Sequence, residues 1–471
     1  MKKFINVLAV MLALVMCLGV VVACADDKEG DTATEATTTA PGTTKPTTTK
    51  TPPTTTTAEV TTTEDPAKDR IPTPTVDVPA DGVITTAEQL HAVLVNGDVT
   101  KDYTVNAEKL DMGKYTWVGM VGYTGTFDFG GCTIENAIDS LFISVLNGTV
   151  KNLKLANATY YYSNDDATAE TNPATNEAGN LYYSPVVRYA KDVTIQNVTI
   201  ESSVKVTSEI WTNGSSHGGV VGYATGTNIV IENCHFKGEY TTDSLIVRVG
   251  GVVGTIDCSD VASINMDAVE ESLARAYNCT NTGTVNSLGV GNDSKAGAVV
   301  GYLANAVVVN CANYGQMLSN DSGQTGGVVG YVGNTTYMKN CINTGKVVGA
   351  SFTGGICAYS NGSARYFENC VNLGNVSSTS VNWGGIIGLN KSSENLTNCF
   401  NLFTEAGTLK FMQNNTTGEL NPADAATHGN TILVNCANLE TVDAIFTAID
   451  NAAPGVFQKT AAGSIELVVA E

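Results

Sequence analysis

The sequence predicts an all-β fold: a parallel, right-handed β-helix of about eleven coils with small helical caps, after a disordered Thr-rich linker. The pair Asn-Cys occurs seven times in 471 residues, and its successive cysteines lie 45, 32, 30, 29, 29 and 37 residues apart. The apolar runs between these pairs are short, rich in β-branched residues and bounded by Gly and Asn, which is typical of strands. A β-propeller is the rival architecture, but its blades need about 40 to 50 residues.

The chain begins with an expected export signal, residues 1–23, in which two lysines precede an apolar run. The end of this run, Val21-Val22-Ala23-Cys24, resembles a bacterial lipobox. The resemblance implies cleavage before Cys24 and attachment of a diacylglyceryl group to its sulfur. An uncleaved membrane anchor is the alternative, because about 20 apolar residues can span a bilayer. We expect a protein outside the cytoplasm, lipid-anchored to the bacterial cell membrane and exposed at the cell surface.

Residues 24–75 are expected to be a disordered linker. Threonine supplies 18 of the 33 residues from 31 to 63, and four prolines are interspersed. Such a segment has too few apolar groups to offset the entropy lost on ordering. Semi-extended, it would hold the folded part roughly 100 Å from the membrane, at about 3 Å per residue.

Caps are expected at both ends of the β-helix, because end strands otherwise present unpaired backbone groups. In the N-terminal cap, residues 76–116, Thr86 and Gln89 have the spacing of a capping box. The coils are expected over residues 117–438. The C-terminal cap, residues 439–471, has apolar residues at helical spacing and then a strand-like alternation.

The Asn-Cys pairs are expected to form a structural ladder. Asparagine tolerates the left-handed conformation that a corner requires, and stacked amides can bond along the helix axis. The cysteine behind it is expected to fill the interior as a free thiol, because the residue that follows varies freely. Cross-coil disulfides are the alternative, since stacked Cα atoms about 4.8 Å apart lie within disulfide range. The ladder consists of Asn233, Cys234, Asn278, Cys279, Asn310, Cys311, Asn340, Cys341, Asn369, Cys370, Asn398, Cys399, Asn435 and Cys436.

Several segments resemble bacterial surface β-helix proteins. Ile84–Leu90 and Gly130–Asn136 are similar to the opening of such proteins, and Gly219–Gly222 and Gly327–Gly330 resemble GLUG-type repeats. The repeats depart from that pattern in having Val for the usual Leu. The resemblance covers most of residues 80 to 440. It implies an exported, adhesin-like protein, whose role is attachment or display rather than one particular reaction.

Charge and motifs argue against nucleic acid, metals and cofactors. With 46 acidic and 25 basic residues the net charge is -21, whereas nucleic-acid binding relies on Lys and Arg. No Cys-x-x-Cys or His-rich spacing indicates a metal site, and no cofactor is expected.

A catalytic site is not expected, although β-helices include polysaccharide lyases and glycoside hydrolases. Those reactions need convergent carboxylates, or acids with a nearby basic side chain. The candidates here fall at different phases of the repeat, and the best of them lie in the segment 257–260. The candidates are Asp128, Asp165, Asp166, Asp257, Asp260, Asp293, Asp321, Arg188 and Arg248.

Tyrosine side chains are stronger candidates for a ligand-binding site than the acids are for a catalytic site. One repeat position carries tyrosine in several coils, where outward rings could contact a ligand and inward rings would belong to the core. Further tyrosines bracket a polar insertion at residues 163–180, and loops on a rigid scaffold are common recognition sites. The candidate ligand-binding residues are Tyr123, Tyr223, Tyr302, Tyr331, Tyr359, Tyr161 and Tyr182.

The expected function is therefore non-catalytic binding or adhesion by a monomer, with a glycan or a host or envelope protein as partner. A polysaccharide lyase or glycoside hydrolase and a passive display rod are the alternatives.

Overall fold

The computed structural model describes residues 70–163, 181–211, 214–258, 264–289, 291–320, 323–391, 394–402, 411–414, 418–420 and 431–468. These residues belong to one compact unit, Glu64–Glu471. The predicted export signal, the predicted linker up to residue 69 with Cys24, most of the polar insertion and the candidates Asp165, Asp166, Asp260 and Asp321 lie outside the described residues. No helix among the described residues is long and apolar enough to cross a membrane.

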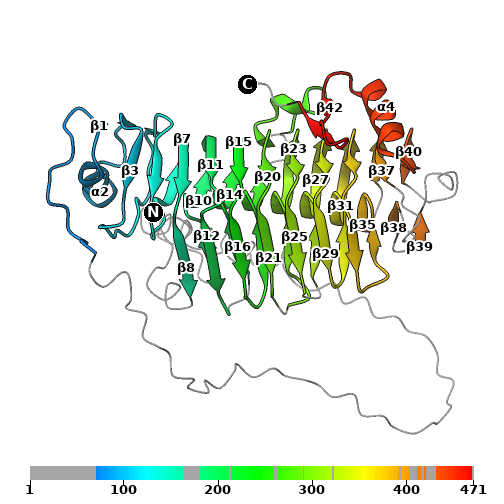
Figure 1. Cartoon of the computed structure of the whole chain (residues 1–471), viewed down its shortest axis with the longest axis horizontal. Helices are drawn as coiled ribbons and strands as arrows, with labels where there is room; N and C mark the ends of the chain where they lie inside the picture. The colour runs from blue at the N-terminus through cyan, green and yellow to red at the C-terminus, as the bar shows by residue number, and fades with distance from the viewer. Residues whose placement is uncertain are drawn as a thin grey trace, which may run out of the picture. The chain divides into compact units, whose positions relative to one another are not determined.

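The chain folds as a parallel β-helix, which confirms the predicted fold class (Figure 1). Strands of successive coils pair in parallel and in register, so that one residue type can occupy the same place coil after coil. Two sheets of seven strands and one large sheet make up the coil walls.

The two smaller sheets contribute one short strand per coil. The first consists of β8 (Thr159–Ser163), β12 (Lys205–Glu209), β16 (Glu239–Thr242), β21 (Thr284–Ser287), β25 (Gln316–Ser319), β29 (Lys346–Gly349) and β33 (Val376–Ser378). The second consists of β9 (Tyr182–Tyr183), β13 (Ser215–Gly218), β17 (Val247–Gly250), β22 (Lys295–Gly297), β26 (Gln324–Gly326), β30 (Phe352–Gly354) and β34 (Trp383–Gly384).

The large sheet contains three rows of strands that share some members. The first row is β1 (Val83–Ile84), β2 (Tyr103–Val105), β4 (Thr126–Asp128), β7 (Thr149–Ala156), β11 (Thr194–Ile200), β15 (Ile229–Phe236), β19 (Ala274–Tyr277), β23 (Val300–Val309), β27 (Val329–Lys339), β31 (Cys357–Glu368), β36 (Glu394–Thr397) and β40 (Ile432–Val434). The second row is β6 (Phe142–Leu146), β10 (Val187–Lys191), β14 (Val221–Gly226), β18 (Val253–Cys258), then β23, β27 and β31, and β35 (Ile387–Asn390) and β38 (Met412–Asn414). The third row is β3 (Lys109–Asp111), β5 (Thr133–Glu135), then β7, β11 and β15, and β20 (Thr280–Asn281), β24 (Ala312–Asn313), β28 (Ile342–Asn343), β32 (Val371–Asn372), β37 (Phe400–Leu402) and β41 (Ala437–Leu439). Strand β39 (Gly418–Leu420) pairs antiparallel with β38, and a short 3-10 helix covers Val269–Glu271.

The cysteines of the ladder face the interior. Six of the seven are fully buried, and Cys436 in the last coil is partly exposed. They are free thiols that hydrogen bond to main-chain carbonyls, as Cys341 Sγ does to Val308 O at 3.5 Å. Burial raises the pKa of the thiols of Cys234 and Cys311 well above the ordinary value, so these side chains are protonated at neutral pH.

A second asparagine ladder lies inside the coils, three residues after the first. Each of its amides donates to the next coil, with Nδ2 to Oδ1 distances of 2.8 Å for Asn281 to Asn313 and 2.7 Å for Asn343 to Asn372. The side chains are buried except at Asn438, where exposure is intermediate, so these bonds satisfy groups that would otherwise be costly to desolvate. In the preceding coils the same register position carries Phe236 and Ile200. The ladder consists of Asn281, Asn313, Asn343, Asn372, Asn401 and Asn438.

Helix α2 (Ala87–Asn96) lies beside the first coils (Figure 1). Thr86 and Gln89 form a complete capping box at its start, which satisfies main-chain groups that the first turn leaves unpaired. Leu90 and Val93 point from this helix into the core.

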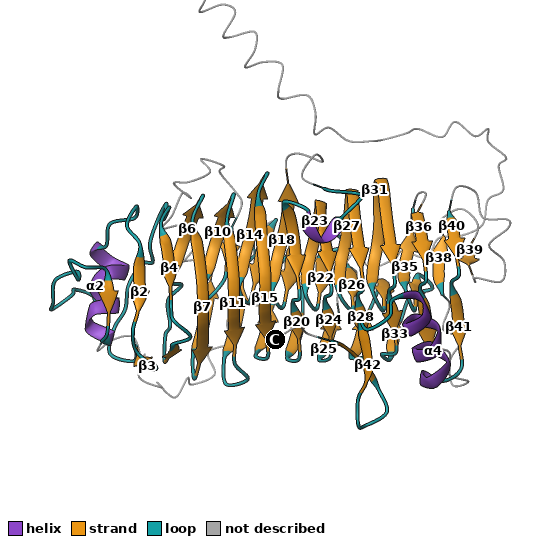
Figure 2. Ribbon diagram, turned by 90° about the horizontal axis from the view of Figure 1, so that it is seen from above, coloured by secondary structure: helices purple, strands orange, loops and turns teal. Residues whose placement is uncertain are grey.

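The C-terminal segment lies against the side of the coils rather than across their open end (Figure 2). Helix α4 (Val442–Ala452) and the hairpin of β42 (Phe457–Lys459) and β43 (Ile465–Leu467) form a separate apolar cluster with outward residues of four coils. The hairpin reaches back far enough for Leu467 N to donate to Tyr314 Oη at 3.0 Å. The expectation of an end cap is corrected here, because the outward face of these coils is apolar and needs cover. The covered residues are Ala312, Ile342, Val371 and Phe400.

Candidate functional site

The tyrosine row runs along the second row of strands in the large sheet, outside the main core. Tyr302, Tyr331 and Tyr359 are in register, and Tyr223 lies two coils before Tyr302. Tyr189 also belongs to this row, although it lacks the Val-Gly that directly precedes most of the other tyrosines. Leu389 ends the row and Thr255 interrupts it.

Tyr123 does not belong to this row, and its assignment as a ligand-binding residue is wrong. Its side chain is fully buried in the core, and its main chain bridges to Val145 rather than to the strand position of Tyr189. Its hydroxyl donates to Lys101 O at 3.0 Å. Sequence alone could not fix which face of the strand this tyrosine occupies.

The rings of the row stack on one another, which limits what they offer a ligand. Tyr302 and Tyr331 have centroids 5.1 Å apart and planes 8° apart, and Tyr331 and Tyr359 follow at 5.3 Å. Side chains of the second sheet cover other faces: Tyr182 stacks on Tyr223 at 4.6 Å, and the Arg248 guanidinium lies 4.6 Å from the centre of Tyr302. These contacts occupy the ring faces, so this row is poorly suited to stacking on sugar rings.

Tyr161 lies elsewhere, on β8 of the first sheet. Its side chain is 57% exposed, and its hydroxyl donates to Glu209 Oε2 at 2.9 Å. The candidate tyrosines therefore occupy three different faces and the core.

Three of the candidate catalytic residues gather around Tyr302. Burial raises the pKa of Tyr302 to about 12, and the charges of Asp257, Arg248 and Asp293 also act on it. Burial likewise raises the pKa of Asp257, while Arg248 lowers it. Asp293 is paired with Lys295, whose Nζ lies 2.7 Å from its Oδ1.

The other described candidates lie apart from this group. Asp128 belongs to β4, and Arg188 donates from Nε to Ser140 Oγ at 2.9 Å. Within the described part of the chain, no three His, Cys, Asp or Glu side chains are grouped as a metal site would require.

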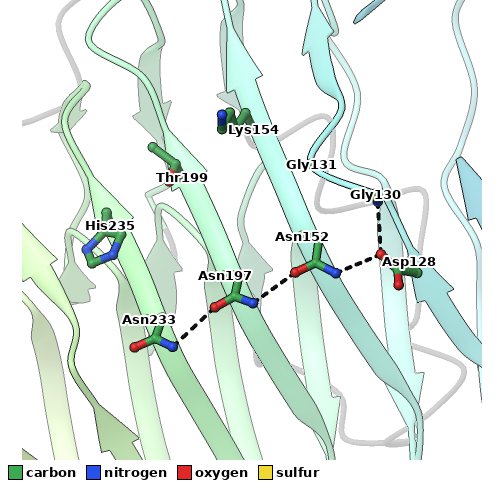
Figure 3. A pocket seen from close by; sticks show the side chains of 9 residues that line it. All are labelled: Asp128, Gly130, Gly131, Asn152, Lys154, Asn197, Thr199, Asn233 and His235. Atoms are coloured by element: carbon green, nitrogen blue, oxygen red, sulfur yellow. Dashed lines mark hydrogen bonds between the residues drawn. The ribbon is translucent and has the colours of Figure 1, made fainter. Parts of the chain in front are cut away.

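A polar hollow on β4, β7, β11 and β15 is another candidate site (Figure 3). Its volume is about 480 Å³, and it is open to solvent along one side. We call it the Asn-lined concavity. It is lined by Asp128, Gly130, Gly131, Asn152, Lys154, Asn197, Thr199, Asn233 and His235.

Hydrogen-bonded amides form the floor of the Asn-lined concavity (Figure 3). Asn233 Nδ2 donates to Asn197 Oδ1 at 3.2 Å, and Asn197 Nδ2 donates to Asn152 Oδ1 at 2.8 Å. Asn152 Nδ2 ends the chain on Asp128 Oδ1 at 2.8 Å. All three asparagines have φ between 52 and 62°, the left-handed region that asparagine tolerates best among residues with a side chain. The amides thus point the same way along the axis, and the carboxylate accepts the last bond.

Asp128 is fully engaged in this arrangement. Its Oδ1 also accepts from Gly130 N at 2.9 Å, and its Oδ2 lies 3.2 Å from Lys151 Nζ. Although burial acts to raise it, these hydrogen bonds hold the pKa of Asp128 below the ordinary value. The carboxylate is therefore ionised and held in place, which suits a structural role better than proton transfer.

A second line of side chains forms the wall of the concavity. Lys154, Thr199 and His235 are in register on β7, β11 and β15, two residues beyond the asparagines. His235 Nδ1 lies 2.8 Å from Thr280 Oγ1, and burial lowers the pKa of the imidazole. The wall is thus one cation, one hydroxyl and one neutral imidazole.

The concavity is confined to the early coils because this same line of residues becomes apolar further on. After His235 and Thr280 it continues with the four residues that α4 and the hairpin cover. One face of the β-helix is therefore open and polar at its N-terminal half and apolar and covered at its C-terminal half.

Of the side chains that line the concavity, the sequence indicates only Asn233, as part of the ladder, and Asp128, as an acid. Asn152 and Asn197 occupy the ladder position but are followed by Leu153 and Val198 instead of cysteine. A search for asparagine followed by any buried side chain would have found them.

Comparison with known proteins adds little on function. No protein-family model matches the sequence, and no curated protein matches it. Among solved structures, the chain resembles a Bacteroides ovatus protein provisionally named an immunoglobulin A1 protease. The two share 17% identity over 83% of this chain and 92% of that one, with a TM-score of 0.39. A likeness at this level carries no argument about activity.

Proposed function

We propose that this chain is a lipid-anchored, non-catalytic binding protein of the bacterial cell surface, and that its β-helix holds a polysaccharide in the Asn-lined concavity. The observation that carries the proposal is the polar lining, which repeats on successive coils. Sugars expose many hydroxyls, and they are recognised by closely spaced donors and acceptors such as these amides.

The rigidity of the site supports the proposal. Its side chains project from paired strands, where position is fixed more firmly than on loops. Its one carboxylate is held by Asn152, Gly130 and Lys151, so the concavity lacks the opposed acid and base that sugar hydrolysis uses.

The lipobox resemblance, the Thr-rich linker and the GLUG-type segments favour display at the cell surface. An anchored protein that binds one end of a polymer would attach the cell to it, which is the adhesin-like role that the resemblance implies.

The test is retention of the full-length chain, purified in detergent, on insoluble polysaccharides and mucin, with reducing ends assayed in the supernatant. We expect retention without release. Changing Lys154, Thr199 and His235 together to alanine should lower retention at least about tenfold, the loss expected from one or two hydrogen bonds. Lys205→Ala with Thr241→Ala, on the outer face of the first sheet, is the matched control. Equal retention of both variants would overturn the assignment of the site.

A polysaccharide lyase or hydrolase is the second candidate, favoured by the grouping of Asp257, Arg248 and Asp293 around Tyr302. A carboxyl whose pKa is raised by burial has the property that a general acid requires. Release of sugar ends that Asp257→Asn abolishes would establish this function instead.

A further inference from the structure

The Asn-lined concavity repeats its groups with the spacing of the coils. Asn152 with Lys154, Asn197 with Thr199, and Asn233 with His235 form three equivalent pairs on β7, β11 and β15. Neighbouring strands lie about 4.8 Å apart, so the first and third pairs are separated by roughly 10 Å. A ligand that fills this site has to present recognition groups at the same intervals.

The amides in the floor indicate which chemical group of a ligand would bind there. Each asparagine side chain has two N–H hydrogens and an oxygen with two lone pairs. The ladder uses one hydrogen and one lone pair at Asn197, which leaves one donor and one acceptor of this lining residue without a hydrogen bond among the described residues. The partner that matches both at once is another amide, whose carbonyl accepts and whose N–H donates.

The spacing between coils indicates which kind of polymer would fit the site. A β-1,4-linked pyranose chain is extended, and it advances by close to one strand spacing per sugar ring. Successive rings are turned over, so substituents of alternate sugars face the same side. Acetamido groups on the first and third sugars would then lie over Asn152 and Asn233, and a ring hydroxyl of the middle sugar over Asn197.

We propose that the Asn-lined concavity binds a β-1,4-linked glycan that carries N-acetyl groups, one sugar ring per coil and parallel to the helix axis. This inference rests on the proposed function and names its substrate class. A neutral chitin-type polymer also avoids the repulsion that a net charge of -21 would impose on an acidic polysaccharide.

The length of the site sets a limit on the ligand. Gly131, at the N-terminal edge, has open space where a side chain would lie. Beyond His235 and Thr280, the residues at the same position of the coil are apolar and are covered by α4 and the hairpin. Three sugars therefore fill the site, and a fourth adds few contacts.

Titration calorimetry of the full-length chain in detergent tests these statements. Chitotriose should bind about tenfold more tightly than chitobiose, and chitotetraose within about threefold of chitotriose, because only the third sugar reaches a further amide. Cellotriose, which has the same backbone without acetamido groups, should bind at least about tenfold more weakly than chitotriose.

The variant Asn233→Asp addresses the amide directly. It keeps an oxygen and a side chain suited to the left-handed backbone but removes the N–H donors. Asn435→Asp is the matched control. Like Asn233, Asn435 is the last asparagine of a ladder series, and its Nδ2 donates to Asn398 Oδ1 at 2.8 Å. It lies outside the concavity. We expect Asn233→Asp to weaken chitotriose binding about tenfold and Asn435→Asp to leave it unchanged.

The outcomes separate this inference from the proposed function. Equal binding of cellotriose and chitotriose, or equal binding by Asn233→Asp and wild type, would overturn the N-acetyl assignment while polysaccharide binding stood. Failure of every polysaccharide and oligosaccharide to bind would overturn both.

Discussion

The corner asparagines of the later coils combine two features, a left-handed backbone and a ladder hydrogen bond. Asn369 has φ 52°, donates to Asn340 Oδ1 at 2.9 Å and accepts from Asn398 Nδ2 at 3.0 Å. Asn369→Ala should lower the free energy of unfolding by about 3 kcal/mol, since it loses the bonds and places alanine in the left-handed region. Asn369→Gly should cost about 1 kcal/mol less, because glycine loses the same hydrogen bonds but adopts the left-handed region without strain. Urea unfolding measures both, and equal costs would show that the backbone term is absent.

Glu394 makes the stability depend on pH. It lies in the interior with Arg365 Nη2 at 3.2 Å and Ser360 Oγ at 2.9 Å, and burial raises its pKa from 4.5 to about 8. Between these values the folded chain holds a proton that the unfolded chain releases, so stability should fall as pH rises, by up to about 1.4 kcal/mol per pH unit. Urea unfolding at pH 5, 6.5 and 8 should show this fall, and Glu394→Gln should flatten it. Parallel profiles for the two proteins would contradict the assignment.

The cysteine ladder should be almost unreactive in the folded protein. Every cysteine of the described residues is buried except Cys436, which is partly exposed, and burial raises the pKa of Cys341 and Cys399. Thiol titration of the mature chain should therefore show one fast thiol, with the rest reacting only on denaturation, because the thiolate is the reactive form. Cys436→Ser should remove the fast phase. Several fast thiols would place the ladder at the surface.

The role of a single residue could be predicted only where the repeat pattern also determines which way its side chain points. The Asn-Cys pair marks a corner and an inward neighbour together, so the ladder could be predicted. A tyrosine that follows Val-Gly carries no such pair, and Tyr123 and Tyr302 face different ways although both follow Val-Gly. The stacking of the rings depends on register between coils distant in sequence, which no local pattern contains.

At the level of elements, the C-terminal helix illustrates the same limit. Its apolar spacing predicted a helix, and α4 forms there. Its position on the side of the coils depends on the residue after each ladder cysteine, which the repeat pattern does not constrain. That residue is polar at His235 and Thr280 and apolar at the next four coils, and the apolar stretch determines where the helix packs.

The packing of α4 can be weakened without loss of the coils. Ile445 and Ile449 are fully buried in its cluster, which is separate from the main core. Replacing both with alanine should destabilise this contact by about 2 kcal/mol or more per site. We expect proteolysis and hydrogen exchange to increase over residues 441–468, while amides of β27 and β31 stay protected. Thr447→Ala, exposed on the same helix, is the control, and simultaneous loss of protection in the coils would show that the segment is integral to the fold.

For the whole molecule, one face of the β-helix is open and polar in its first half and apolar and covered in its second half, and the proposed anchor precedes the β-helix in the sequence. A stack of coils gives a rigid surface whose recognition groups repeat along its length, and each coil contacts mainly its neighbours. Binding strength then grows with the number of coils that match the ligand. A tether long enough to reach beyond the membrane would let such a surface meet a polymer outside the cell.

The anchor itself is open to a direct test. If Cys24 is the lipidated residue, labelled palmitate should be incorporated into the wild-type chain and lost in Cys24→Ala, which should appear in the culture medium or the soluble envelope fraction. Cys17→Ala should keep the label, because Leu18, Gly19 and Val20 continue the apolar run behind that cysteine. The released chain should bind chitotriose as the anchored one does, since the concavity lies more than a hundred residues from the anchor. Persistence of the label in Cys24→Ala would remove the lipid anchor from the proposal and leave an uncleaved apolar segment as the means of attachment.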